Sequence, residues 1–202
     1  MSEAHSRIIV LGPPNSGKGE LARRLSKVLG IEHLFIAKEL LSRASSDGNG
    51  MTKYMSGVVN AAISDGVLVT DDIVVDVINN TLVESRSESW VLSGAPGTLH
   101  QAEIFESLPK IGQRQVIFLI LQNFDDNLMW QLFQRQDKKR NTLEIFHRQR
   151  MCYLKNSKRI ERFVQAHRSW RIRYLNVGEM SGDDLLNQAL KALDVQIPIS
   201  TV

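Results

Sequence analysis

The 202-residue chain has a single cysteine, Cys152, so it can form no internal disulfide and cannot build a zinc site from thiolates. It has no apolar run near the ~20 residues that a membrane-spanning helix needs. Its first residues, MSEAHSR, lack the apolar segment of a secretory signal peptide. Proline-rich linkers, internal repeats and low-complexity tracts are missing too. We therefore expect one cytoplasmic domain with no membrane partner.

Acidic residues are scarce in one part of the chain, although the whole carries a formal net charge of only +3. Residues 135–173 hold 13 Lys or Arg and three acids, which leaves the rest of the chain at −7. We expect this basic segment to attract anions such as polyphosphate or an acidic protein partner, although charge runs are also common on solvated helix faces. Few aromatic residues accompany the charge, so we rank nucleic-acid binding last.

Short apolar runs alternate with helical patterns along most of the chain. The runs are RIIVLG, EHLFIA, SWVLSG, RQVIFLIL and IRYLNV, and apolar residues recur every three or four positions between them. This alternation is typical of βαβ units, in which helices cover both faces of a parallel sheet. We predict an α/β fold of three layers, α/β/α, with a five-stranded parallel sheet. Gly30 is expected to end the first helix, Thr70 or Asp71 to begin a later one, and residues 183–193 to form the last.

One interval, from about Asp125 to His167, breaks the alternation because it has no strand signal. Its pattern is helical, and it contains the basic cluster QRQDKKRNTLEIFHRQR. A helical excursion from a sheet that carries many arginines is a candidate lid.

The segment GPPNSGKGE follows the first apolar run and precedes the helical pattern LARRLSKVLG. In a glycine-rich turn between a strand and a helix, backbone N–H groups surround a phosphate, the helix N-terminus adds a positive dipole, and a lysine reaches the distal phosphates. The pattern favours a phosphate-binding loop (P-loop) over residues 12–18, with Lys18 as its cation, over an ordinary turn with a surface lysine. The usual motif has Ser or Thr after the lysine, where this chain has Gly19.

The chain resembles the nucleoside-monophosphate kinases, and adenylate kinase most closely. GPPNSGKG resembles the family's loop GPPxxGKG, GVLVTDDIV resembles its GxLVPDxxV, and WVLSGAPGTLHQAE resembles its xxLDGFPRTxxQAE. Arg135 resembles the arginine that opens the family's lid, and residues 140–153 resemble the return of the lid. The matches occur in the family's order over nearly the whole chain. The resemblance implies a P-loop α/β fold with a helical lid insertion.

The resemblance also implies the chemistry: ATP as the cofactor, with Mg²⁺ if the chain is active, and AMP as the acceptor. It assigns catalysis to Lys18, Arg135, Arg140 and Arg150. It assigns cofactor binding to Gly12, Asn15, Ser16, Gly17, Lys18, Gly19, Glu20 and Arg135. It assigns substrate binding to Arg43, Leu68, Val69, Gly94, Gln101 and Arg148, and it names no protein ligand for a metal. The single domain, 1–202, is expected to divide into a core (5–124 and 168–194), an acceptor-binding part (about 37–66) and a basic, lid-like segment (about 125–167).

Several positions depart from the family pattern, and they concern the acceptor and the metal. The acid that organises magnesium-bound water in the family is Ser93 here, and the arginine that clamps the acceptor phosphate is Gly97. A second acceptor-side arginine falls on Ser42, with Arg43 one position later. One position rotates a helical side chain by about 100°, so we expect Arg43 to miss the phosphate unless the register shifts.

Two residues keep alternative interpretations. Glu20 stands where the family has a threonine that touches phosphate; it either turns outward as a first-turn acid, which the helix dipole favours, or coordinates magnesium itself. Gln101 either holds the acceptor base or completes a helix capping box with Thr98. We predict a nucleotide-binding phosphotransferase, ATP + AMP to 2 ADP, with impaired activity. The alternative is an inactive interaction module that keeps the kinase fold.

Overall fold

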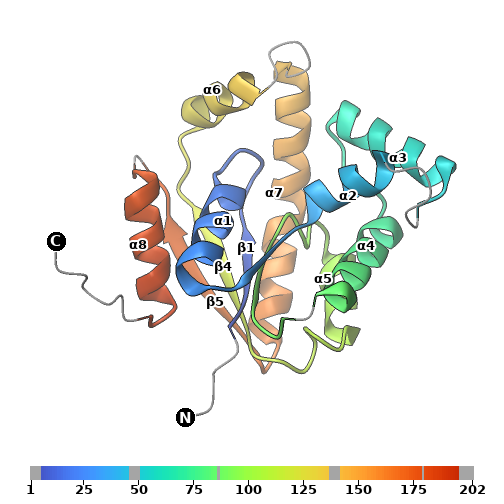
Figure 1. The fold of residues 1–202 in the computed structure, drawn as a ribbon. Coiled ribbons are helices and arrows are strands. Elements are labelled where there is room, and N and C mark those ends of the chain that lie inside the picture. Colours follow the sequence, from blue (N-terminus) through green and yellow to red (C-terminus); the bar gives the residue numbers. More distant parts are fainter. Residues whose placement is uncertain (1–5, 46–50, 86, 137–141, 179, 196–202) are drawn as a thin grey trace.

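The computed structural model describes residues 6–45, 51–85, 87–136, 142–178 and 180–195. Five strands form one sheet in the order β2-β3-β1-β4-β5, and every neighbouring pair is parallel (Figure 1). The strands are β1 (Arg7–Leu11), β2 (Glu32–Phe35), β3 (Trp90–Ser93), β4 (Val116–Gln122) and β5 (Trp170–Asn176). The predicted five-stranded parallel sheet is confirmed, and each strand overlaps one of the five apolar runs.

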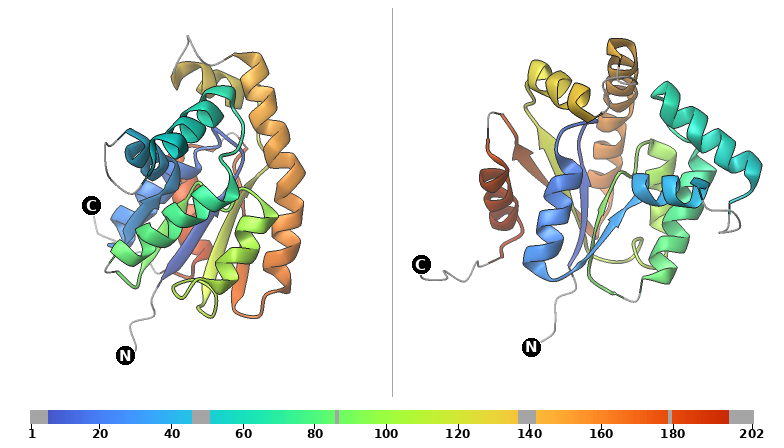
Figure 2. Two further views of the ribbon diagram at one scale, coloured as in Figure 1. Left: turned by 90° about the vertical axis from the view of Figure 1, so that its right-hand side faces the viewer. Right: turned by 45° about the horizontal axis from the view of Figure 1, so that its top comes forward.

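Helices cover both faces of this sheet (Figure 2). They are α1 (Lys18–Leu29), α2 (Ile36–Ser45), α3 (Lys53–Asp65), α4 (Asp71–Glu84), α5 (Leu99–Ser107), α6 (Asp126–Gln136), α7 (Leu143–Ala166) and α8 (Gly182–Ala192). Successive residues of a strand point to opposite faces. Ile8 and Val10 accordingly pack in the core with α1 and α8, whereas Ile9 and Leu11 join the larger core with α4, α5 and α7. The three-layer prediction is therefore confirmed.

Local signals fix the ends of several helices as expected. Gly30 ends α1 with φ of 65°, a left-handed conformation that glycine adopts without strain, and Thr70 stands at the N-cap of α4. The last helix lies one residue earlier than predicted. The Ser181 hydroxyl accepts a hydrogen bond from Asp184 N, which fixes the start of α8 at Gly182.

The helical excursion predicted after β4 consists of α6 and α7. Phe133 of α6 packs on Phe146 near the start of α7, in a small cluster separate from the two main cores. Further along α7, Ile160 and Val164 are buried in the larger core. The single 24-residue helix α7 therefore packs against α6 near its start and against the core of the sheet near its end. In the described residues, no helix is long and apolar enough to cross a membrane.

The C-terminal end of α3 lies directly against α7. The Arg148 guanidinium donates a hydrogen bond to the carbonyl oxygen of Asp65, at 2.9 Å, and another to the Glu144 carboxylate, at 2.6 Å. Gly66, which ends α3 with φ of 67°, comes so close that a Cβ there would lie 2.6 Å from Ile145 Cγ2. A glycine is required here for two reasons, its left-handed backbone and the approach of α7.

Replacing Gly66 with alanine is expected to lower the free energy of unfolding by about 2–3 kcal/mol, because left-handed strain adds to overpacking against Ile145. Gly30→Ala is a matched control, since Gly30 has nearly the same φ, but among the described residues no atom beyond its chain neighbours lies within 4 Å of its Cβ position. We expect the control to lose only about 1 kcal/mol. Urea denaturation of both variants measures the difference. Equal losses would show that the α3–α7 contact does not constrain the protein.

Candidate functional site

The loop of residues 12–17 joins the carboxyl end of β1 to the first turn of α1. Gly17 is the N-cap of α1 with φ of 80°, and Asn15 has φ of 63°. A Cβ on Gly12 would lie 2.7 Å from Ser16 Oγ, so the loop closes tightly on itself. Backbone N–H groups in such a turn, together with a helix N-terminus, attract anions.

Lys18 is the first residue of α1, and its ammonium group turns back over the loop. Its Nζ donates a hydrogen bond to the carbonyl oxygen of Pro13, at 3.1 Å. Burial lowers the pKa of Lys18 to about 8, from an ordinary value of 10.5. A cation held in a desolvated position gains more from an incoming anion than an exposed one does.

Two further polar groups of the loop are buried without a hydrogen-bond partner among the described residues: the amide nitrogen Nδ2 of Asn15 and the hydroxyl of Ser16. Leaving a buried donor unpaired costs free energy, about 1–3 kcal/mol. A ligand seated on the loop could supply the missing acceptors.

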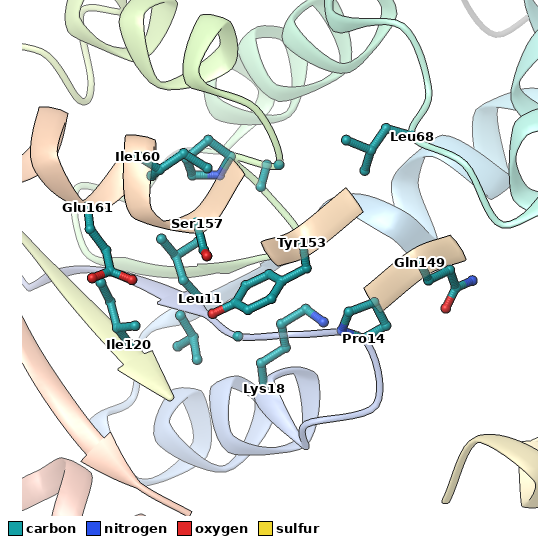
Figure 3. A pocket seen from close by; sticks show the side chains of 16 residues that line it. Leu11, Pro14, Lys18, Leu68, Ile120, Gln149, Tyr153, Ser157, Ile160 and Glu161 are labelled. Carbon is teal, nitrogen blue, oxygen red and sulfur yellow. The ribbon is translucent and has the colours of Figure 1, made fainter. Parts of the chain in front are cut away.

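A cavity of about 150 Å³ lies between this loop and α7. Lys18 and Pro14 line one side, Gly94 and Gly97 of the turn after β3 line another, and Leu68 also lines the cavity. The remaining wall comes from α7 through Gln149, Tyr153, Ser157, Ile160 and Glu161. Figure 3 shows the Tyr153 ring next to Lys18, with Glu161 at one end and Leu68 and Gln149 at the other. The cavity brings together Gly12, Lys18, Leu68 and Gly94 of the sequence-predicted site.

The sequence predictions named none of these α7 residues as part of the site, although residues 140–153 were compared with the return of the family's lid. Gln149, Tyr153 and Ser157 recur every four residues, which places them on one helix face, and this polar spacing was the available signal. Burial, with a smaller effect of the Glu161 charge, raises the pKa of Tyr153 to about 12. Tyr153 is therefore a neutral hydroxyl at ordinary pH. The Tyr174 hydroxyl donates to Glu161 Oε2 at 3.4 Å.

Glu20 lies on the outer surface of α1. The Arg23 guanidinium donates through Nε to its Oε2, at 2.8 Å, and through Nη2 to its Oε1. Hydrogen bonding from Arg23 lowers the pKa of Glu20. Of the two interpretations of Glu20, the geometry supports an outward first-turn acid.

Ser93, at the position of the family's metal-shell acid, is fully buried at the end of β3. Its hydroxyl lies 2.9 Å from Nε2 of His33, whose ring stacks on Phe35. Burial, assisted by the charges of Arg23 and Lys38, lowers the pKa of His33, which favours the neutral imidazole. In the described part of the chain, no three His, Cys, Asp or Glu side chains form a group that could hold a metal. Mg²⁺ is usually bound through one or two carboxylates together with substrate phosphates, and among the described residues that line the cavity Glu161 is the one carboxylate.

The arginines expected at the site are turned elsewhere. Arg43 donates to Glu84 Oε2 at 2.7 Å, at the far end of α4, and Arg148 binds Asp65 and Glu144 as described above. Arg150 forms an ion pair with Asp126 of α6, at 2.7 Å. None of the three lines the cavity. Arg135 belongs to α6, but its side chain lies outside the described residues, as does the whole of Arg140.

Gln101 is buried and held at both ends of its amide. Its Oε1 accepts a hydrogen bond from Gly97 N at 2.6 Å, and its Nε2 donates to Asp71 Oδ1 at 2.9 Å. The Thr98 hydroxyl caps α5 by accepting from Gln101 N and also donates to Asp71. The Thr98 half of the capping box is therefore present, whereas the Gln101 side chain binds Gly97 N, one residue before the N-cap, and ties α5 to the start of α4. Val69 is buried beside the exposed Leu68.

Comparisons with known proteins agree on one family. Residues 10–167 match the family model described as adenylate kinase. An adenylate kinase of Synechococcus sp. (strain WH7803) is 29% identical over 150 residues, covering 71% of this chain and 79% of that protein. One from Prochlorococcus marinus is 33% identical over 144 residues, covering 71% and 76%. One from Caldicellulosiruptor saccharolyticus is 27% identical over 232 residues, covering 94% and 100%.

Proposed function

The chain belongs to the adenylate kinase family, and on that premise we propose that it binds ATP at residues 12–18 and that its transfer of phosphate from ATP to AMP is impaired. The loop supports the first part. It combines a left-handed Gly17, a desolvated Lys18 and unpartnered groups on Asn15 and Ser16. Each of these could contact a phosphate chain laid along the start of α1.

The acceptor and metal side supports the second part. Phosphoryl transfer depends on positioning and on positive charge around the moving group. Arg43 and Arg148 are bound to other groups, and Gly97 brings no charge. The hydrogen-bonded His33 and Ser93 bring no carboxylate where an acid is expected. Donor binding is therefore proposed to survive better than catalysis.

One contrast carries the proposal: the loop has the geometry of an anion site, while the acceptor-side arginines are engaged elsewhere. Calorimetry with ATP and with AMP, each with and without Mg²⁺, tests it. We expect ATP binding that depends little on Mg²⁺, and weak AMP binding. A turnover of roughly 1–100 per second, which is ordinary for kinases, would contradict impairment.

The affinity for ATP is expected to fall as pH rises above 8. Below its pKa of about 8 the Lys18 ammonium is charged and attracts phosphate, and above it the free protein must take up a proton to bind. We expect about a fifteenfold loss of affinity between pH 8 and 9.5, with the slope approaching tenfold per pH unit at the upper end. Calorimetry from pH 7.5 to 9.5 measures it, with Lys18→Met as a variant that should lack the slope. A flat wild-type profile would mean that Lys18 keeps an ordinary pKa.

A second candidate function is an interaction with an acidic protein, without catalysis. Lys155, Lys158, Arg159 and Arg162 lie on the exposed side of α7. None of them forms an ion pair with another described residue. Free cations on one helix face favour an anionic partner. This function would not depend on Lys18.

A further inference from the structure

Strand β5 is the last strand at one side of the sheet, and its outer edge pairs with no other strand among the described residues (Figure 1). The residues that flank β5 both bond the segment of β4 through their backbone, Ser169 through its carbonyl oxygen and Val177 through its N–H. In a parallel pair, alternate residues of a strand bond a given neighbour, so residues 171, 173 and 175 also turn their backbone groups to β4. The backbone groups of residues 170, 172, 174 and 176 therefore point to the free edge.

Two of these outward carbonyl oxygens are covered by arginines of β5 itself. Arg171 Nη1 donates a hydrogen bond to the carbonyl oxygen of Trp170, at 2.9 Å, and Arg173 Nη1 donates to that of Ile172, at 3.2 Å. Charged side chains on an edge discourage the addition of another strand. A strand that paired with β5 here would have to displace both guanidinium groups from the carbonyl oxygens.

The displacement is favourable only if the incoming strand offers each arginine a better acceptor. A guanidinium that leaves a neutral carbonyl oxygen for a carboxylate gains a charge-assisted hydrogen bond, which can be bidentate. A neutral strand would take over the carbonyl oxygens and return nothing to the arginines except water. Arg171 and Arg173 therefore select against a neutral strand and in favour of an acidic one.

The charge around β5 favours the same partner. Residues 155–173 hold seven Lys or Arg and one acid, Glu161. None of the seven cations forms an ion pair with another described residue. The Glu161 carboxylate is itself hydrogen-bonded by the Tyr174 hydroxyl. Such an excess of positive charge attracts an acidic segment and speeds its association.

The two faces of β5 predict the residue pattern of the incoming strand. Arg171 and Arg173 alternate with Ile172 and Tyr174, which lie on the face toward α7. Ile172 is half-buried and Tyr174 is 43% exposed, so both can still bury apolar surface. Side chains of neighbouring strands meet on the same face. Acidic residues beside the arginines would therefore alternate with apolar residues beside Ile172 and Tyr174.

From these observations we propose that the free edge of β5 binds an acidic, extended segment of a protein partner as an added strand, in which acidic and apolar residues alternate. Main-chain hydrogen bonds supply affinity in this mode of recognition, and the side chains supply specificity. The inference goes beyond the proposed function, because it does not depend on the nucleotide loop and names a surface other than the exposed side of α7.

Fluorescence anisotropy with the full chain tests the added strand, with a labelled peptide of about eight alternating Glu and Val residues as the probe. We expect this peptide to bind, and a peptide with Gln in place of each Glu to bind at least about tenfold more weakly. Two further peptides keep the charge but carry N-methyl groups, one on every Glu nitrogen and one on every Val nitrogen. Because alternate nitrogens face β5, at least one of them should also bind about tenfold more weakly.

Three results with these peptides overturn the inference: no binding of the Glu–Val peptide, equal binding of the Gln peptide, or equal binding of both N-methylated peptides. All of them use the wild-type protein, so they do not depend on how a variant folds.

A pair of double variants locates the bound peptide. Arg171→Gln with Arg173→Gln should weaken binding of the Glu–Val peptide about tenfold or more. Lys155→Gln with Arg159→Gln removes the same charge from residues that lie about 120° and 160° around α7 from Glu161, and should weaken it less than about threefold. Thermal unfolding shows whether each variant is folded. An equal loss in the two folded variants would place the peptide on α7, which overturns this inference and leaves the second candidate function standing.

Discussion

Replacing Lys18 with alanine should lower the affinity for ATP by at least a hundredfold, about 3 kcal/mol. Among the described residues, Lys18 is the one cation that lines the cavity, and its Nζ lies over the loop, hydrogen-bonded to Pro13. Charged hydrogen bonds contribute about 1.5–3 kcal/mol each, and a lysine at this position can reach two phosphates. Calorimetry at pH 7.5 measures the loss.

Two further variants make this result interpretable. Lys18→Met keeps most of the aliphatic stem and removes the charge, so it should lose nearly as much affinity as the alanine variant. Lys27→Ala removes an exposed cation from the last turn of α1 and should have little effect. ATP that bound equally well to all three variants would have to occupy a different site.

The largest gain is expected from restoring charge on the acceptor and metal side. Ser93→Asp with Gly97→Arg should raise the rate of ADP formation from ATP and AMP at least tenfold over a baseline near zero, because each recovered contact stabilises the transition state. A Cβ on Gly97 would lie 3.4 Å from Leu68 Cδ2, an ordinary contact, and a new carboxylate at position 93 would lie beside His33.

The single variants and the addition of Glu20→Thr serve as controls for the double variant. Each single variant should gain less than the pair, since the acceptor charge and the metal-shell acid act on the same transition state. Adding Glu20→Thr should help further only if the outward Glu20 still disturbs the phosphates; its pairing with Arg23 predicts a small effect. A folded double variant without any gain would mean that the defect lies elsewhere, and a wild-type enzyme of ordinary rate would remove the premise of the experiment.

The fold could be predicted from the sequence because it depends on local patterns. The strands β1 and β4 are continuous apolar runs, as expected for strands buried on both faces, and the intervening helices show apolar residues at helical spacing. The end of α1 at Gly30 follows from backbone sterics that act within a few residues. The start of α8 was predicted one residue too late, although the N-cap Ser181 that fixes it is itself a local signal.

The site was predicted only in part, because side-chain partners come from distant segments. The loop of residues 12–18 was recognisable since its atoms are contiguous in the sequence. The pairing of Arg148 with Asp65 and of Ser93 with His33 joins residues that are far apart along the chain, and no local pattern indicates it. Arg43 was expected to miss the acceptor phosphate, but its partner Glu84 was not foreseen. The role of Arg135 stays a prediction.

Helix α7 makes three separate sets of contacts along its length. Near its start, Arg148 donates a hydrogen bond to the end of α3, and further along Tyr153 lines the cavity. Near its end, Ile160 and Val164 are buried in the larger core. The helical repeat fixes the angle about the helix axis at which each of these contacts points. A single residue inserted between Tyr153 and Ile160 would rotate the preceding part of α7 by about 100° relative to the part that follows. Arg148 would then lose its contact with α3, and Tyr153 would no longer line the cavity.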